Sequence, residues 1–238
     1  MKNTVLHKAD SRGHADHGWL NAYHSFSFAN WYNPDRIQFG MLRVLNDDTV
    51  AAGMGFGTHP HDNMEIITIP LEGDLAHKDS MGNAATIKTG DVQVMSAGTG
   101  IQHSEFNPNH DQHTKLFQIW LFPKYRNVEP RYQQITLDQS LQKNDFAQIL
   151  SPNADDEGVW IHQDAWFYLS DFDNGFSKKL SLKKEGNGFY IMNIEGEIEV
   201  NGEKLERRDA IGIWGTNEIE IKANIDSKFL VMEIPMEQ

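Results

Sequence analysis

Two short stretches of this chain each carry two metal-ligating residue types spaced two positions apart. The first holds His59 and His61, and the second, about forty residues later, holds His103 and Glu105. Alternate residues of a β-strand point to the same face, so each pair would present both side chains on one side of its strand. If the two strands are neighbours in a closed sheet, three imidazoles and one carboxylate converge on one point.

Such a set suits a divalent first-row metal such as iron, manganese, nickel, copper or zinc. A lone histidine would more often be a surface residue or a hydrogen-bonded core residue. Two ligand pairs, each bordered by glycines, are much harder to obtain by chance. The spacing therefore predicts one metal site, built from His59, His61, His103 and Glu105.

The composition narrows the possible functions. The 238 residues are 39% hydrophobic and 23% charged, which is ordinary for a globular protein with a sizeable core. The formal net charge of −13 argues against direct binding to nucleic acid or to an anionic membrane, because both require a basic face. Without cysteine, neither a disulfide framework nor a thiolate metal site can form. No signal-like or membrane-length apolar run is present, so we expect a cytoplasmic protein.

Short apolar or alternating stretches, separated by turns that contain glycine and aspartate, predict an all-β fold. Nearly all of residues 58–122 follow this pattern, and it resumes after residue 146. Strands at this spacing favour a sandwich or a barrel. The polar, proline-containing connection at 123–134 predicts a division into two domains, residues 1–133 and residues 134–238.

Several individual elements can be predicted from the same pattern. We expect an alternating strand over 23–28 and a strand over 39–45 that ends at the polar triplet 46–48. We also expect a continuous strand over 61–71, turned by the glycine that follows it. Helix is scarce, and 137–143 is expected to form a short helix or a loop.

The second half of the chain echoes the first. Leu-Glu-Gly-Asp at 71–74 resembles Ile-Glu-Gly-Glu at 194–197, and Thr-Gly-Asp at 89–91 resembles Arg-Arg-Asp at 207–209. At these offsets the four ligand positions correspond to Leu182, Lys184, Ile221 and Ala223. The second repeat is therefore expected to keep the strands and to lack the metal site.

The N-terminal segment carries further histidines without a strict ligand spacing, and we assign them to capping and surface hydrogen bonds. They are His7, His14, His17 and His24. Large apolar residues elsewhere could line a pocket, although such residues are more often plain core. The candidates are Phe39, Met41, Met64, Phe117 and Trp120.

The arrangement of glycines and ligand residues resembles the two motifs of the cupin superfamily. The residues that match are Gly53, His59, His61, Glu65 and Gly73 in the first motif, and Gly90, Ser96, Gly98 and His103 in the second. Within that superfamily the chain resembles the pirin family more closely. The stretches that carry this resemblance are 24–30, 57–61, 71–73, 77–83 and 95–105. The resemblance is dense over about residues 5–125 and weaker beyond, and the length is similar to that of bacterial pirin-like proteins.

The resemblance implies a bicupin, an all-β fold in which two cupin-type β-barrels pack face to face and the first holds one metal ion. The family ligands correspond here to His59, His61, His103 and Glu105. We expect iron(II), with manganese, nickel, copper, cobalt or zinc as alternatives. In several pirins the activity is a quercetin 2,3-dioxygenase, whereas animal pirins are nuclear transcription cofactors whose iron acts as a redox sensor.

Glu105 is the expected catalytic residue, because it is the one ligand that can also accept a proton. A six-coordinate ion with four protein ligands keeps two positions, one for a substrate hydroxyl and one for dioxygen. Glu65 shares strand parity with His59 and His61. It could be a ligand, but we favour a supporting role in which it holds a ligand histidine by the distal N–H.

The resulting hypothesis is a metal-dependent dioxygenase whose partners are a flavonol-like aromatic compound and dioxygen. The alternative is a metal-dependent regulatory protein that acts through a protein partner and has no catalytic role. A third possibility is another metal-dependent reaction, such as isomerisation of a small polar metabolite, because cupin folds host many chemistries.

Overall fold

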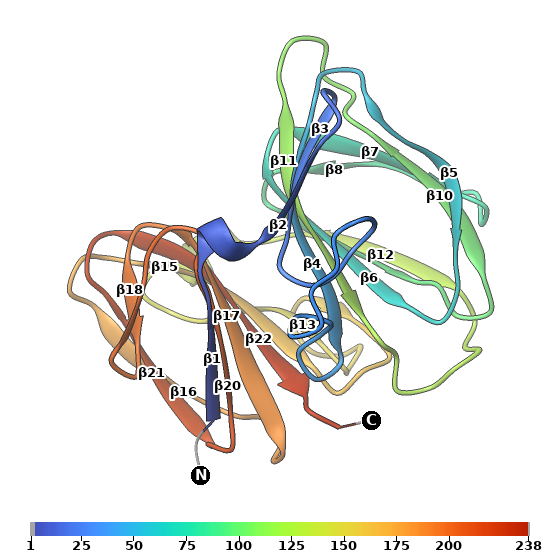
Figure 1. The fold of residues 1–238 in the computed structure, drawn as a ribbon. Coiled ribbons are helices and arrows are strands. Elements are labelled where there is room, and N and C mark those ends of the chain that lie inside the picture. Colours follow the sequence, from blue (N-terminus) through green and yellow to red (C-terminus); the bar gives the residue numbers. More distant parts are fainter. Residues whose placement is uncertain (1–2, 238) are drawn as a thin grey trace.

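The computed structural model describes residues 3–237 and shows four β-sheets arranged as two barrels (Figure 1). Each barrel combines one seven-stranded sheet with one four-stranded sheet. The predicted all-β architecture of two barrels is therefore confirmed. Helix is confined to two short 3₁₀ segments in this part of the chain, η1 (Ala9–Ser11) and η2 (Gln139–Gln142), the second within the expected 137–143. No helix in residues 3–237 is long and apolar enough to cross a membrane.

The first barrel carries the motifs that the sequence singled out. Its seven-stranded sheet has the order β12 (Arg131–Thr136), β9 (Asp91–Ser96), β6 (Glu65–Glu72), β11 (Thr114–Leu121), β4 (Leu42–Val50), β3 (Leu20–His24) and β2 (Gly13–Asp16). Its four-stranded sheet has the order β5 (Gly55–His61), β10 (Ile101–Phe106), β7 (Asp74–Asp79) and β8 (Ala84–Lys88).

The second barrel repeats this plan. Its seven-stranded sheet has the order β1 (Asn3–His7), β20 (Ala210–Trp214), β17 (Asn187–Glu195), β22 (Ser227–Pro235), β15 (Trp166–Phe172), β13 (Ala147–Ser151) and β14 (Val159–Trp160). Its four-stranded sheet has the order β16 (Ser177–Ser181), β21 (Glu218–Ala223), β18 (Ile198–Val200) and β19 (Glu203–Leu205).

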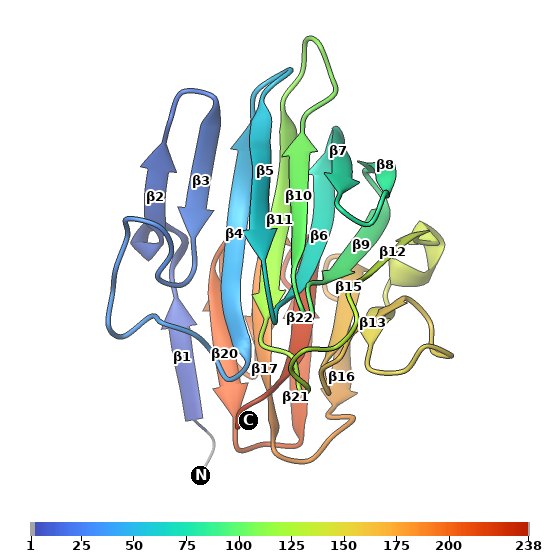
Figure 2. The same cartoon turned by 90° about the vertical axis from the view of Figure 1, so that its right-hand side faces the viewer.

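The first domain donates one edge strand to the second barrel. The N-terminal strand β1 pairs with β20 of the second barrel, and Figure 2 shows it beside that strand, apart from β2 and β3. At the other end of the first domain, β12 pairs with β9 as an edge strand of the first barrel. The predicted boundary between residues 133 and 134 falls inside β12, because a polar edge strand resembles a linker in sequence. We propose to place the boundary after Thr136, with β1 as a strand donated to the second barrel.

The two seven-stranded sheets pack against each other through one apolar core. On β11, Phe117 and Ile119 belong to this inter-barrel core, and on β22 Leu230 and Met232 meet them from the other side. The alternate β11 residue Gln118 faces the interior of the first barrel. Each large sheet is thus buried on both faces, which explains why its central strands are almost continuously apolar.

Three predicted strands have different bounds in the structure. β3 ends at His24 rather than at Phe28, and β4 continues through residues 46–48 to Val50. The acidic pair in β4 does not end the strand, because Asp47 points outward, where Arg12 lies 3.0 Å and Arg208 3.4 Å from Asp47 Oδ2.

The predicted strand over 61–71 is interrupted. β5 ends at His61 and β6 begins at Glu65, and the two belong to different sheets. At the break, Asn63 has φ 47° and its N–H donates to the Gly98 carbonyl at 2.9 Å. Asparagine tolerates this left-handed conformation better than most residues, so the chain can turn there between the two sheets.

The internal repeat is borne out by the matching arrangement of the sheets, which differ at one edge, where β13 and β14 are parallel and β2 and β3 antiparallel. The register corrects the alignment of the repeat. The turn that follows β6 contains Gly73 (φ 74°), and the turn that follows β17 contains Gly196 (φ 86°). Aligned on these turns and on the strand pairing, the four ligand positions correspond to Leu180, Leu182, Ile219 and Ile221. The simple offset misplaced each of them by two residues. All four are apolar and pack into the core of the second barrel.

His7 offers a test of the exchanged strand. It is 5% exposed, and its Nδ1 lies 2.9 Å from the hydroxyl of Tyr190 on β17. Burial, with a smaller effect of Arg36, lowers the pKa of His7 to about 4. The unfolded state therefore binds more protons between about pH 6.5 and 4, so the contribution of neutral His7 to stability is present above pH 6.5 and is lost as pH falls.

We expect wild type to lose up to about 2 kcal/mol more unfolding free energy than His7→Gln when pH falls from 7 to 5. Urea unfolding of both proteins at the two pH values measures this difference. Equal losses of unfolding free energy in the two proteins would mean that His7 is not held neutral where β1 joins the second barrel.

Candidate metal centre

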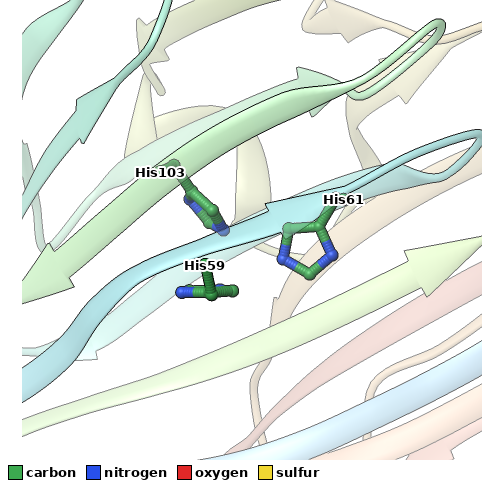
Figure 3. Close-up of side chains that lie close together, drawn as sticks. All are labelled: His59, His61 and His103. Atoms are coloured by element: carbon green, nitrogen blue, oxygen red, sulfur yellow. The ribbon is translucent and has the colours of Figure 1, made fainter.

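Two antiparallel strands of the four-stranded sheet bring the three predicted histidines together. β5 pairs with β10 so that His103 lies opposite His59, and His61 follows on the same face of β5. The ring centroids are 4.4 Å apart for His59 and His103, and 4.9 Å apart for the other two pairs. Figure 3 shows the three rings clustered beside these strands. One nitrogen of each ring lies within 4.8 Å of the others.

The hydrogen bonding of these rings leaves nitrogen lone pairs free. His59 Nδ1 lies 2.8 Å from the Gly57 carbonyl oxygen, so Nδ1 is the donor and Nε2 keeps its lone pair. His61 Nε2 and both ring nitrogens of His103 are buried and have no hydrogen-bond partner within residues 3–237. Buried polar atoms without partners are rare and point to a missing one. Three converging imidazoles fit a metal cation.

Burial also keeps these imidazoles in the form that binds metals. Desolvation lowers the pKa of His61 to about 4, and nearby His59 lowers it further while Asp62 opposes the shift. Desolvation is again the main reason why the pKa of His103 falls to about 2, with smaller effects of His59, His61 and His77. Metal ligands must be deprotonated, so at neutral pH these two rings are ready for an ion.

Glu105, the fourth predicted ligand, lies on the same strand face two residues after His103. It is 4% exposed, and Gln118 Nε2 lies 3.3 Å and 3.2 Å from its two carboxylate oxygens. Burial raises its pKa to about 7, against the opposing effects of Gln118 and Thr68. Glu105 lines the same cavity as the three histidines, and its carboxylate also forms a close group with His103 and His77, within 4.8 Å.

His77 is a neighbour of the site to which sequence analysis gave no role. It lies opposite Glu105 in the β7–β10 pairing, its Nε2 lies 3.2 Å from Asp79 Oδ2, and its Nδ1 is buried without a partner within residues 3–237. Its ring packs on Tyr132 with a centroid distance of 4.9 Å. The stretch 77–83 was noticed only as part of the family resemblance. The β7–β10 register, which sequence alone does not give, places His77 beside Glu105.

A cavity of about 240 Å³ opens in front of the histidines. The seven-stranded sheet supplies most of the wall that faces them, and much of the lining is apolar. Its lining residues are Leu20, Ala22, His24, Phe28, Asn46, Asp48, Phe56, His59, His61, His103, Glu105, Gln118 and Trp120. The three polar residues that β3 and β4 contribute were missed from sequence, because the polar triplet 46–48 was interpreted as the end of a strand.

Glu65 does not take the supporting role that parity suggested. It accepts a hydrogen bond from Ser96 Oγ at 2.7 Å, and within residues 3–237 it has no histidine ring as a partner and belongs to neither group of ligand-type residues. Parity failed because the break at Asn63 moves Glu65 into the other sheet. Burial raises its pKa to about 7, while the Ser96 hydrogen bond, the His162 backbone and Arg131 oppose this shift.

Of the five candidate apolar residues, Trp120 lines the cavity. The other four are core residues, the commoner role: Phe39, Met41 and Phe117 lie in the inter-barrel core, and Met64 packs against a smaller cluster. The expectation for the N-terminal histidines needs correction. Of the N-terminal histidines, His24 lines the cavity and is only 3% exposed. The assignment of these histidines to surface roles is therefore wrong for His24 and for buried His7.

Comparison with known proteins agrees with this geometry. A family model for pirin matches residues 5–121, and a model for the quercetinase C-terminal cupin domain matches residues 148–234. A protein of Escherichia coli (strain K12) named quercetin 2,3-dioxygenase is 42% identical over 234 residues, which cover 97% of this chain and 98% of that protein. A pirin-like protein of Caulobacter vibrioides is 39% identical over 225 residues, or 94% and 96% of the two chains.

The fold is likewise similar to that of solved proteins. The crystal structure of bacterial pirin YhhW from Escherichia coli in complex with nickel(II) is 40% identical in sequence and has a TM-score of 0.93. The match covers 98% of this chain and 99% of that one.

Removing His103 should abolish metal binding without unfolding the protein. After loading with nickel(II) or, without oxygen, with iron(II), we expect about one ion per wild-type chain, and an affinity at least about a hundredfold lower in His103→Ala. The exposed His113→Ala variant is the matched control and should bind like wild type. Elemental analysis of the dialysed proteins gives the ratio. Two ions per chain, or full occupancy in His103→Ala, would contradict the site.

Proposed function

We propose that this chain, which belongs to the pirin family, is a metal-dependent dioxygenase that opens the central ring of flavonols such as quercetin. One divalent ion would be held by His59, His61, His103 and Glu105. The observation that carries the proposal is that three clustered imidazoles and the buried carboxylate of Glu105 line the same largely apolar cavity. The Escherichia coli relative named quercetin 2,3-dioxygenase supports the choice of substrate.

The ligand set leaves the identity of the ion open among divalent first-row metals. Nickel(II) is bound by the similar bacterial pirin YhhW. Iron(II) remains our expectation for this chain, on the strength of the family resemblance and not of the donor set. When bound, the ion would supply a Lewis acid for a substrate hydroxyl and a redox centre for the reaction with dioxygen.

Glu105 would accept the proton that the substrate hydroxyl loses. Its carboxylate is buried in the same cavity as the three histidines, beside the positions that a bound ion would leave open to substrate. Gln118 donates to both carboxylate oxygens and so fixes the orientation of the carboxylate. The apolar lining of the cavity, including Phe28, Phe56 and Trp120, would exclude water from the reacting groups.

The size of the cavity bears on how a flavonol would bind. Typical ligand pockets enclose about 300–1,000 Å³, and this cavity encloses about 240 Å³. We therefore expect a flavonol to enter with one end and to leave an outer ring at the mouth.

Oxygen uptake with flavonols tests the activity and the role of Glu105 together. Metal-loaded wild type should consume oxygen with quercetin. Glu105→Gln keeps the size and one oxygen donor but loses the charge and the base, so we expect turnover to fall about 10²–10⁴-fold at equal metal content. An oxygen electrode, with metal content measured on the same samples, provides both quantities.

The two parts of this proposal fail separately. If metal-loaded wild type consumes no oxygen with any flavonol, the enzyme hypothesis is wrong for this substrate class and a metal-dependent regulatory role through a protein partner becomes the better account. If Glu105→Gln turns over like wild type at equal occupancy, the activity stands and Glu105 is not the base.

A further inference from the structure

The cavity has a second polar region, on the sheet that faces the histidines. β5 and β10 carry the histidines on the four-stranded sheet, whereas β3 and β4 belong to the seven-stranded sheet on the other side of the barrel (Figure 1). From that side, His24, Asn46 and Asp48 line the cavity among the apolar Leu20 and Ala22.

The side-chain oxygen Oδ1 of Asp48 is fully buried and has no hydrogen-bond partner within residues 3–237, and the residue as a whole is only 5% exposed. Its neighbour Asp47 faces the other side of the strand and meets both Arg12 and Arg208. A buried carboxyl without partners is unfavourable, and one that lines a cavity is completed by something that enters the cavity.

The surroundings of Asp48 favour a hydrogen-bonding neutral acid. Burial is the main reason why its pKa lies well above the usual range, and the charges of Asp47 and Glu105 add to the effect. A protonated carboxyl can donate one hydrogen bond and accept others, so it can pair with a hydroxyl in either direction.

The neighbouring polar groups are fixed in place. His24 and Asn46 face each other across β3 and β4, and His24 Nδ1 lies 2.9 Å from Asn46 Oδ1. Because the amide oxygen can only accept, His24 Nδ1 is the donor in this pair. Asn46 is two residues before Asp48 and thus on the same face of β4, so the two side chains form one polar strip with a rigid support.

We propose that Asp48, supported by Asn46, is a substrate anchor that binds a hydroxyl group of the substrate on the wall of the cavity opposite the histidines. This inference rests on the proposed function and narrows its substrate class. The cavity would select aromatic compounds that carry, besides the chelating oxygens, a phenolic hydroxyl on the ring that enters the cavity. Asp48 is a binding residue here and takes no part in the oxygen chemistry.

Binding without turnover tests the anchor directly. Zinc-loaded protein is a suitable probe, because zinc is redox-inactive. Two flavonols are compared by fluorescence titration: quercetin, which carries hydroxyls on both outer rings, and 3-hydroxyflavone, which carries only the chelating hydroxyl and carbonyl. For Asp48→Leu we expect about tenfold weaker binding of quercetin, the loss typical of one buried hydrogen bond, and unchanged binding of 3-hydroxyflavone. Asp48→Asn keeps hydrogen-bonding capacity and should lie between Asp48→Leu and wild type.

Thermal stability provides a second, independent measurement on the same proteins. A carboxyl kept for binding and left without partners lowers stability, so the melting temperature of ligand-free Asp48→Asn should equal or exceed that of wild type. Asp74→Asn makes the same chemical change on β7, outside the cavity, and should leave flavonol binding unchanged.

Each outcome decides the question. Three results would each overturn the anchor: an equal loss of affinity for both flavonols in Asp48→Leu, no loss of quercetin affinity in that variant, or a lower melting temperature in Asp48→Asn. The proposed function would stand in these cases, provided that wild type binds flavonols. If neither flavonol binds to wild type, the anchor falls together with the proposed function.

Discussion

The pairing of β5 with β10 is the constraint on which the candidate metal centre depends. Because the strands are antiparallel and His103 lies opposite His59, the spacing of two residues within each motif becomes a cluster of rings 4.4–4.9 Å apart. The cluster is not self-sufficient, since several buried ring nitrogens have no partner in the part of the chain described. An ion bound there would stabilise the fold, because the folded chain gathers the ligands and the unfolded chain does not.

The second barrel makes this arrangement possible by covering the first. Alternate residues of β11 serve two cores: Phe117 and Ile119 pack against the second barrel, while Gln118 holds Glu105 inside the first. The strand β1, which pairs with β20 of the second barrel, joins the barrels further. In the second barrel the ligand positions hold leucine and isoleucine, so its interior is filled where the first barrel keeps a cavity. The second barrel thus stabilises the molecule through its filled core, whereas the first barrel retains buried polar groups that are unfavourable for stability.

Sequence pattern predicted the all-β class, the repeat and the three histidines, since each follows from a local period of two and from residue type. It failed where tertiary contacts decide. Glu65 had the right parity, but the left-handed turn at Asn63 moves it to another sheet. In sequence, Asp47 and Asp48 are typical of a strand end. The strand continues because Arg12 and Arg208, from distant segments, form ion pairs with Asp47. His77 could not be placed near Glu105 without the register of β7 and β10.

The central claim is that one ion is bound by His59, His61, His103 and Glu105, although Glu105 also lies close to His77. Diffraction at the absorption edge of the metal, from crystals of the metal-loaded protein, tests it most directly. The account predicts a single anomalous peak in the first barrel, about 2.0–2.3 Å from one nitrogen of each of the three histidines and from an oxygen of Glu105. A peak bound by His77 in place of His59 and His61, or a peak inside the second barrel, would contradict it.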